Sequence, residues 1–498
     1  MSILESNSVE DTIDKHFHEG SYLINVFPFV LGLVSTVNVG CLAELLKQKF
    51  IKSDRSDMLL STILYCLFEA QDEMLCCEFG QVFSEKNDVK LAIRSDLEYR
   101  YAAYFLSVCG CKCLNVTFPS LLRDTQFELL GHYLCNTSTD ISFNFDNVRL
   151  SEKGMKVLDE ILTCQHNLCS LKISRLIINS PNCVKLMCDT ICKYNLSIIT
   201  IWLSGTYTMS KVELDSLGCL LIILKSVECL CITCSPVQSL ISSDSFSNAL
   251  CDTKSLKQFE FGIYSYDDGK MISNILSQNS SLKTLRINYV ENTDYLTMIF
   301  DGLSSNKTVT WFTASPATRV SDLIMLGQSI EKCIAHNQSL TWLDFNLKVM
   351  WSSSQVCSIC TGLQSNNTLV TLDISGCYID KTASDAVCIM LSLNTSLQHL
   401  FLNPVHMEKP EAVAIIDTCN TNTTLVVLSL LKWSYKWRAF KFVFSTDQKI
   451  DHMLDQVQKS RQDKKKPILK VIWENLENTV VKKEILNTLK FINTPGIY

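Results

Sequence analysis

The chain contains 498 residues, which is enough for two or more compact domains or for one elongated repeat array. Its formal net charge is −6, which argues against nucleic acid as the main partner, because neutralising phosphates requires a basic surface. Apolar residues make up 47% of the chain and charged residues 19%, so most segments must bury one face and disorder is not expected to dominate.

The N-terminal residues favour a cytoplasmic location. Residues 1–20 contain acidic side chains where a secretory signal needs a basic end and an apolar core. The 24 cysteines are therefore expected to be reduced, small core residues. The uncharged stretch Tyr22–Ala43 is long enough to span a bilayer, but Pro28 and Asn38 interrupt it. A buried helix pair is therefore favoured, and a membrane span is not expected.

Residues 1–135 predict an all-helical domain. Apolar residues recur at helical spacing in Leu42–Leu46, Leu60–Phe68 and Tyr101–Val108, and no repeat is evident between these segments. Such a domain is expected to cap the open end of the array that follows.

Residues 136–430 repeat a motif in which apolar residues stand three and five positions after a first one. Ten copies recur at intervals of 26 to 31 residues, and a weaker copy begins at Ser138. The copies are Leu168-Leu171-Ile173, Ile198-Ile201-Leu203, Val227-Leu230-Ile232, Leu256-Phe259-Phe261, Leu282-Leu285-Ile287, Val309-Phe312-Ala314, Leu340-Leu343-Phe345, Leu369-Leu372-Ile374, Leu397-Leu400-Leu402 and Leu425-Leu428-Leu430. Each copy predicts a strand, and the residues between copies, such as Ala383–Leu393, predict a helix. Because one strand and one helix cannot bury both apolar faces alone, neighbouring units must stack, with strands on the concave side and helices outside.

The segment Leu369–Ile379 is the most complete copy. Its sequence matches the pattern L-x-x-L-x-L-x-x-[N/C]-x-L, and Cys377 occupies the position that buries a small polar group. This segment resembles a leucine-rich repeat, which implies an α/β, ribonuclease-inhibitor-like solenoid of about 11 repeats. Residues 431–498 depart from the pattern, and with one strand at Pro467–Trp473 they are expected to form a modified capping repeat.

Asparagine triplets of the form N-x-[ST] precede six of the predicted strands. They begin at Asn279, Asn306, Asn337, Asn366, Asn394 and Asn422. Each has the form of a glycosylation site, but all fall where a helix must end and turn into a strand. Since asparagine tolerates the left-handed conformation of such endings, a structural role is favoured over glycosylation.

The string LYCLFEAQD at Leu64–Asp72 and the segment Phe29–Val34 resemble the helical region of animal NLR receptors, the nucleotide-binding leucine-rich-repeat proteins. With the repeats, the resemblance covers about residues 20 to 430. It implies the ligand-sensing half of such a receptor. The receptors also use a phosphate-binding loop, G-x-x-x-x-G-K-[ST], and Gly269-Lys270-Met271 lacks its hydroxyl and preceding glycine. No nucleotide binding is therefore expected of this chain.

Metal binding and catalysis are not predicted. Cys109, Cys111 and Cys113 lack the paired spacing of a zinc site, and two C-x-x-C pairs, at Cys231 and Cys357, lie within repeats. None of the eight histidines stands in a nucleophile or metal motif. The chain is expected to be no enzyme and to hold no cofactor. A run of lysines at 464–466 is read as a solvated loop, because acidic residues are interspersed nearby.

Residues between the apolar ones of each strand are expected to line the concave face and to bind a protein or microbial ligand. The candidate binding residues are Trp202, Gln258, Glu260, Arg286, Trp311, Trp342, Asp344, Asp373, His399 and Phe401. Strands about 4.8 Å apart place Trp311 beside Trp342, where the two rings either form a contact hot spot or lie flat over the sheet.

The sequence thus favours a protein-binding sensor or scaffold that resembles the sensing half of an NLR receptor. A non-immune adaptor, such as a cytoskeletal or ubiquitin-pathway scaffold, stays open. So does a GTPase regulator, since an arginine finger leaves no local signature.

Overall fold

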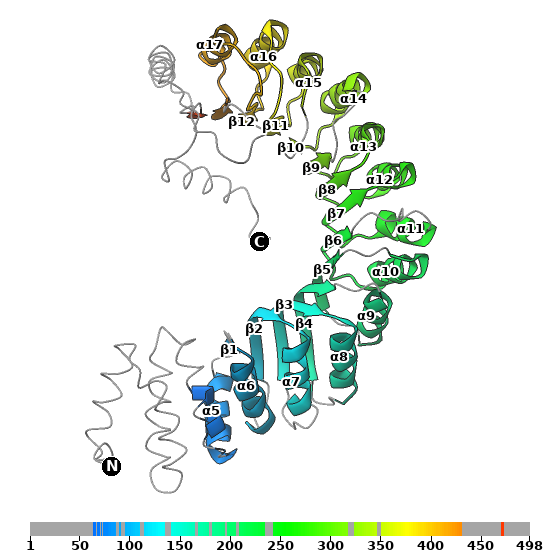
Figure 1. Ribbon diagram of the computed structural model, residues 1–498, viewed down its shortest axis with the longest axis vertical. Coiled ribbons are helices and arrows are strands. Elements are labelled where there is room, and N and C mark those ends of the chain that lie inside the picture. Colours follow the sequence, from blue (N-terminus) through cyan, green and yellow to red (C-terminus); the bar gives the residue numbers. More distant parts are fainter. Residues whose placement is uncertain are drawn as a thin grey trace, which may run out of the picture. The chain divides into compact units, whose positions relative to one another are not determined.

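The structure is a computed structural model that describes residues 63–430 and 470–472. Short gaps fall at 66, 70, 72, 86–88, 91–94, 110–113, 135–140, 165–167, 179–181, 195–196, 206–208, 235–242, 317–322 and 346–349. The chain divides into two compact units, Met1–Leu256 and Lys257–Tyr498. In each unit a row of parallel strands is backed by a row of helices (Figure 1).

The first unit alternates helices and strands along its described residues. The elements are α5 (Glu73–Glu85), β1 (Val89–Lys90), α6 (Asp96–Val108), β2 (Leu114–Leu122), α7 (Asp124–Leu134), β3 (Ile141–Leu150), α8 (Glu152–Cys164), β4 (Leu168–Ile178), α9 (Asn182–Tyr194), β5 (Ser197–Gly205), α10 (Lys211–Ile223), β6 (Cys229–Cys234) and α11 (Asp244–Asp252). Strands β1 to β6 pair in parallel in chain order. Parallel pairing follows from the alternation, because each helix returns the chain to the end of the sheet where the next strand must start.

The prediction of an all-helical domain over residues 1–135 is wrong for its second half. Strands β1 and β2 lie within this range, and β2 pairs in parallel with β3, so the strand–helix alternation begins before residue 136. Phe118 and Leu122 on β2 are completely buried. Their place in the sheet depends on β3 and the helices behind it, which local periodicity does not reveal. The predicted segments Leu42–Leu46 and Tyr22–Ala43 lie outside the described residues.

The string that resembles NLR receptors packs on α6. Its described residues at 64–65 and 67–69 are helical, and Leu64 and Leu67 are buried. The rings of Tyr65 and Phe68 each lie 4.9 Å from the ring of Tyr101, measured between centroids. Leu64, Tyr65, Leu67 and Phe68 thus make core contacts of the first unit. None of the helices described in either unit has the length and apolar character that crossing a bilayer requires.

The second unit continues the same alternation. Its elements are β7 (Gln258–Ile263), α12 (Tyr266–Gln278), β8 (Thr284–Val290), α13 (Thr293–Ser305), β9 (Trp311–Pro316), α14 (Leu323–His336), β10 (Trp342–Phe345), α15 (Ser353–Ser365), β11 (Thr371–Asp373), α16 (Lys381–Leu393), β12 (His399–Phe401), α17 (Lys409–Thr418), β13 (Val427–Ser429) and β14 (Lys470–Ile472). Strand β14 confirms the strand predicted at Pro467–Trp473 and pairs in parallel with β13. The rest of the capping repeat predicted over residues 431–498 lies outside the described residues.

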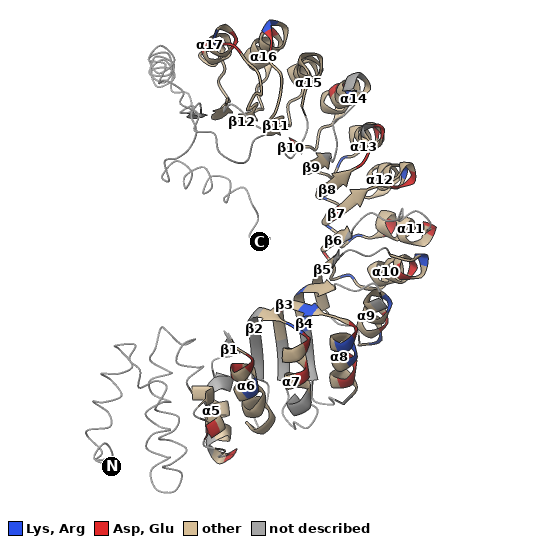
Figure 2. Cartoon of the chain, in the orientation of Figure 1, with Lys and Arg blue, Asp and Glu red and all other residues tan. Residues whose placement is uncertain are grey.

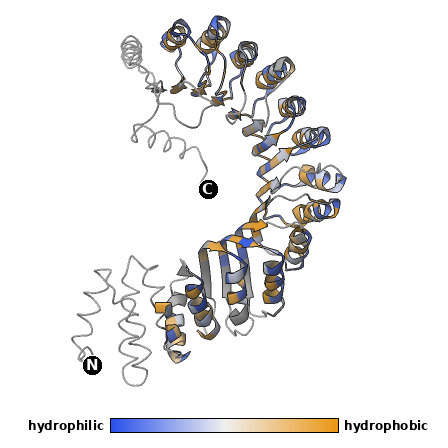
Figure 3. Cartoon of the chain, viewed as in Figure 1, coloured by the Kyte–Doolittle hydropathy of each residue, from blue (hydrophilic) through white to orange (hydrophobic). Residues whose placement is uncertain are grey.

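Local sequence explains where the helices of the second unit begin. Ser265, Asn292, Ser352 and Asp380 are N-caps whose side-chain oxygens accept hydrogen bonds from the first turn of α12, α13, α15 and α16, respectively. The helices carry both hydrophobic and hydrophilic residues (Figure 3). Their buried apolar sides face the strands, as the spacing in Ala383–Leu393 predicts for α16.

The strand register confirms the predicted alignment from β5 to β6 and from β7 to β13. For example, Leu343 pairs with both Phe312 and Leu372, and Leu372 pairs with Leu400. The alignment of the two earliest copies is wrong. Ile198 and Ile201 on β5 pair with Ile173 and Leu176 on β4, so the equivalent copy starts five residues after Leu168.

Strand β4 explains that error. It is 11 residues long and contains two overlapping copies of the apolar spacing. Ile173, Leu176 and Ile178 are completely buried against the rest of the first unit. The pattern alone fits both registers, and only pairing with β5 selects one of them.

The six asparagines that precede the strands form a ladder of side chains inside the second unit. Each is 2–5% exposed. Each Oδ1 accepts hydrogen bonds of 2.7–3.0 Å from the backbone N–H groups two and three residues later. From Asn306 onward, each Nδ2 donates to a carbonyl oxygen near the end of the preceding repeat's helix at 2.6–2.7 Å. The ladder therefore satisfies backbone groups that helix ends leave unpaired.

This arrangement corrects the reason given for the asparagines. Asn279, Asn306, Asn366 and Asn394 cap their helices with extended backbone, for instance φ −81° and ψ 131° at Asn366. None of the six asparagines has a positive φ. The third residue of the triplet also takes part, because the hydroxyls of Thr308, Ser339, Thr368 and Ser396 donate to the carbonyl of the preceding asparagine in the ladder. The N-x-[ST] form thus arises from hydrogen bonding between repeats, and a glycan on a buried Nδ2 would disrupt it.

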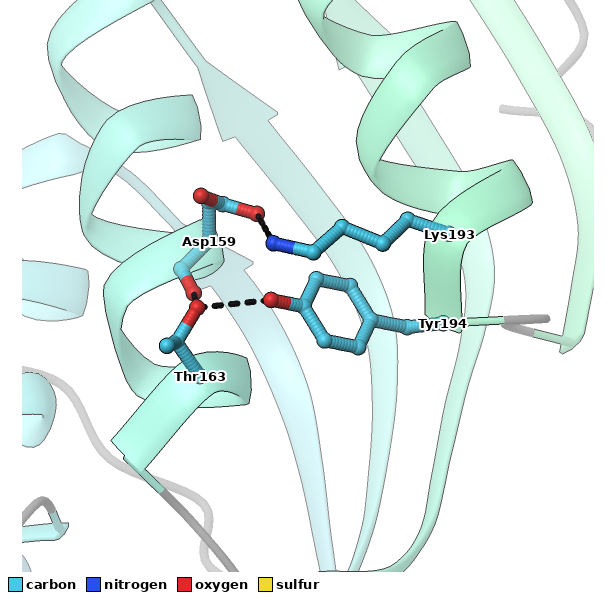
Figure 4. Close-up of polar contacts among 4 residues, drawn as sticks. All are labelled: Asp159, Thr163, Lys193 and Tyr194. Carbon is cyan, nitrogen blue, oxygen red and sulfur yellow. Dashed lines mark hydrogen bonds and ion pairs between the residues drawn. The ribbon is translucent and has the colours of Figure 1, made fainter.

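The helix rows are also linked by polar contacts at their surface, as between α8 and α9 in the first unit (Figure 4). Lys193 Nζ lies 3.3 Å from Asp159 Oδ1, and the hydroxyls of Thr163 and Tyr194 are 2.6 Å apart. Such exposed contacts contribute little to stability, so the packed apolar faces hold the helices in place.

Candidate protein-binding face

The open sheet face of the second unit is the side of strands β7–β13 that is turned away from the helices (Figure 1). Along β7, β8 and β10, half-buried side chains alternate with buried ones that pack toward the helices. The strand register arranges the open positions in two rows. The first row is Gln258, Thr284, Trp311, Trp342, Thr371, His399 and Val427, and the second is Glu260, Arg286, Thr313, Asp344, Asp373, Phe401 and Ser429.

Nine of the ten predicted binding residues therefore lie on this face, in the order expected. The tenth, Trp202, belongs to β5 of the first unit. There its Nε1 donates to Thr233 Oγ1 at 3.2 Å, and the Arg175 guanidinium lies 5.5 Å from its ring centroid. Trp202 is therefore not a residue of the open sheet face of the second unit.

Trp311 and Trp342 stack face to face on the open sheet face. Their ring centroids are 4.5 Å apart and their planes differ by 21°. Two rings lying flat side by side would overlap at this distance, so the rings stand up from the sheet with the spacing of adjacent strands. This geometry removes the alternative in which they merely cover the sheet. Both residues are half-buried, and each leaves part of its indole exposed.

The two indole N–H groups differ. Trp311 Nε1 donates to Thr313 Oγ1 at 2.9 Å, and the Arg286 guanidinium lies 5.5 Å from the Trp311 ring centroid. Trp342 Nε1 is buried and has no acceptor among the described residues. Asp344 stands two residues after Trp342, at the strand position that Thr313 occupies relative to Trp311. The indole N–H of Trp311 is thus hydrogen-bonded, whereas that of Trp342 has no described acceptor.

Asp344 and Asp373 are paired residues on neighbouring strands of the same face. Burial, and then the charge of Asp373, raise the pKa of Asp344 to about 7, although Arg286 acts to lower it. Burial also raises the pKa of Asp373, although hydrogen bonds from Ser375 act to lower it. Ser375 donates to Asp373 Oδ1 through its backbone N–H at 2.9 Å and its hydroxyl at 2.5 Å.

Sequence reasoning missed the residues that hold the predicted ones in place. Asn288 Nδ2 donates to Glu260 Oε1 at 2.7 Å. His399 Nδ1 lies 3.0 Å from the hydroxyl of Thr371, and burial lowers the pKa of the His399 imidazole. Asn288 and Ser375 lie just beyond the apolar motif, at the strand ends, where periodicity carries no information about side-chain partners.

Charged side chains are concentrated on the helices, while strands β9–β13 carry few (Figure 2). The charged residues within β7–β13 are Glu260, Arg286, Asp344 and Asp373. No group of three or more potential metal-ligating side chains occurs in the parts of the chain that the structure describes. The C-x-x-C residues Cys357 and Cys360 lie on α15, and burial raises the pKa of both thiols. The buried Cys377 thiol donates to the carbonyl of Leu402 at 3.1 Å, which fits the role its repeat position predicts.

The fold defines a leucine-rich-repeat-like α/β solenoid, with parallel strands in chain order and a helix described after each strand from β1 to β12. No family model matches the sequence, and no curated protein matches it. Among solved structures, a chain of the crystal structure of the Rad7 and Elc1 complex in yeast matches at 13% identity and a TM-score of 0.36. The match covers 79% of this chain and 93% of that chain. The fold assignment rests on the strand order and register of this chain.

Proposed function

We propose that the open sheet face of the second unit binds a protein and that the chain acts as a binding module and not as an enzyme. The observation that carries the proposal is the upright stack of Trp311 and Trp342, which leaves aromatic surface exposed between a guanidinium and two carboxylates. Tryptophan is enriched where binding energy concentrates, and partial exposure beside polar groups is typical of such anchors.

The first test is to select binding peptides from a random library on the full chain and to compare variants. The double variant Trp311→Ala/Trp342→Ala is expected to weaken peptide binding by about tenfold or more. The matched control is Trp202→Ala, which removes the same side chain from a similar setting under Arg175 in the first unit. It should leave affinity unchanged.

Fluorescence anisotropy gives the affinities, and thermal unfolding shows whether each variant folds. An equal loss of peptide affinity in the double variant and in Trp202→Ala, or no loss of affinity in either, would contradict binding at the open sheet face. A large fall in melting temperature of the double variant would mean instead that the stack is a core element.

We further propose that the chain works as a sensor of the NLR type, with the repeats binding a protein or microbial ligand. The support is the sequence string whose residues pack on α6 through Leu64, Leu67 and the rings of Tyr65 and Phe68. A sensor must change a second region when it binds, so a selected peptide should alter amide hydrogen exchange in α5 and α6. Unchanged exchange there, with the peptide bound, would favour the alternative of a passive adaptor.

A further inference from the structure

We infer that Asp344 and Asp373, beside the edge of Trp342, form a subsite for one cationic side chain, a lysine or an arginine, of the bound protein. The inference rests on the proposed function, since it names what the open sheet face recognises. It depends on the distribution of charge and of unsatisfied polar groups over that face.

The four charged residues of the strands form two unequal pairs. Glu260 and Arg286 are paired across β7 and β8, and their charges are opposite in sign. Asp344 and Asp373 are paired across β10 and β11, where like charges repel. Neither aspartate forms an ion pair with any residue that the structure describes, and Asp344 has no hydrogen-bond donor there either. A cation at this place would be the missing counterpart.

None of the described residues around Asp344 serves as a counter-ion to the aspartate pair. Strand β11 contributes Asp373, and β9 contributes the uncharged Thr313 at the paired position. Arg286 on β8 is the cation that acts on Asp344, but its guanidinium lies over the Trp311 ring on β9, and the two residues form no ion pair. His399 lies on β12, where burial lowers the pKa of its imidazole and so disfavours the cationic form. Among the residues that the structure describes, no side chain therefore supplies the aspartate pair with a cation.

The spacing fits one long basic side chain. Paired strand positions lie about 4.8 Å apart, so a single ammonium or guanidinium can contact both carboxylates. The two rows of the face are about 7 Å apart along a strand, which is within the length of a lysine or arginine side chain. The aliphatic stem would then lie along the exposed edges of Trp342 and Trp311. A calcium ion fits less well, because it needs six to eight oxygen ligands and the pair supplies too few.

The experiment uses the full chain with its 7 tryptophans labelled in the indole ¹⁵N position. The Trp342 and Trp311 signals are assigned by Trp→Phe variants. The probe is N-acetyl-lysine methylamide, and its uncharged counterpart is N-acetyl-norleucine methylamide. We expect the lysine probe to shift the Trp342 signal saturably and the norleucine probe to shift it at least about fivefold less at the same concentration. An arginine probe serves as a second cation.

Three variants test which carboxylates act. Asp344→Asn and Asp373→Asn should each weaken the lysine probe by about fivefold or more. Asp385→Asn removes one negative charge from the second unit at an exposed position on α16, outside the open sheet face, and should leave the affinity unchanged. Proton release on binding should also be detected near pH 7 in the wild type and should be lost in Asp344→Asn.

Equal shifts with the lysine and norleucine probes would overturn the cationic subsite while leaving an aromatic binding face, and so the proposed function, intact. An effect of Asp385→Asn as large as that of Asp344→Asn would also overturn the subsite, because it would mean that net charge alone explains the result. Loss of peptide binding in the tryptophan double variant remains the separate measure of the proposed function.

Discussion

The asparagine ladder and the open sheet face are two sets of equivalent positions in the second unit, and they are built in opposite ways. The ladder uses one residue type throughout, keeps it 2–5% exposed, and has its amide groups bonded to the backbone between repeats. The open sheet face changes residue at nearly every strand and leaves Trp342 Nε1 without an acceptor among the described residues.

The difference follows from what each position must satisfy. Every helix–strand junction leaves the same backbone groups unpaired, so the same side chain recurs there. Most of the open positions are half-buried on the side of the sheet turned away from the helices, so packing constrains their identity less. The proposed function accounts for the unsatisfied Trp342 N–H on this face as a group for binding, since folding does not require it. Breaking each set in turn should therefore have different consequences.

The largest effect on stability is expected from the ladder. Asn366 Nδ2 donates to the carbonyls of Ile334 and Asn337, and its Oδ1 accepts from two backbone N–H groups. Asn366→Ala should lower the free energy of unfolding by about 2–4 kcal/mol, measured by urea denaturation. The control is the exposed neighbour, Asn367→Ala, which should change it by less than about 0.5 kcal/mol. Equal effects of the two variants would contradict the ladder's role.

A smaller effect, dependent on pH, is expected at Asp344. Its pKa is raised from 3.8 to about 7, so the folded chain binds this proton more tightly than the unfolded chain does. The free energy of unfolding should therefore fall as pH rises from about 4 to about 7, and the penalty is complete above 7. Asp344→Asn cannot ionise and should be more stable than the wild type at pH 8 by on the order of 1–2 kcal/mol.

Asp380 provides a comparison of opposite sign. Its pKa is lowered, first of all by the hydrogen bond from the Ala383 backbone N–H at the start of α16. The stability it contributes is present above pH 3.8 and is lost as pH falls through its folded pKa. Urea denaturation of Asp380→Asn at pH 3, 5 and 8 should show a slight loss of stability at the higher pH values. A gain at pH 8, like that of Asp344→Asn, would show that the pH effect is not specific to the open sheet face.

The smallest effect is expected at Thr313, the acceptor for Trp311 Nε1. Thr313→Val keeps the shape but removes the acceptor, and should cost about 0.5–1 kcal/mol in thermal unfolding because the half-buried indole can still meet water. It should also make the two tryptophans alike, each with an unsatisfied N–H. A peptide affinity unchanged within about twofold would show that the Trp342 side is the one that binds.

The sequence by itself determined the repeat architecture. A spacing near 28 residues and an apolar pattern of period two fixed strands β5–β13, the helices between them, and the order Trp311, Trp342, Asp344, Asp373 across the open sheet face. These are properties of local periodicity and of stacking between neighbours.

Only the tertiary structure decided the rest. The register of β4 depended on pairing with β5, and the strand character of Leu114–Leu122 depended on β3, because both segments fit more than one local pattern. The reason for the N-x-[ST] triplets lay in hydrogen bonds to the preceding repeat about 30 residues earlier. The upright stack, the raised pKa of Asp344 and the missing acceptor of Trp342 likewise depend on groups brought together across strands, which a single repeat does not contain.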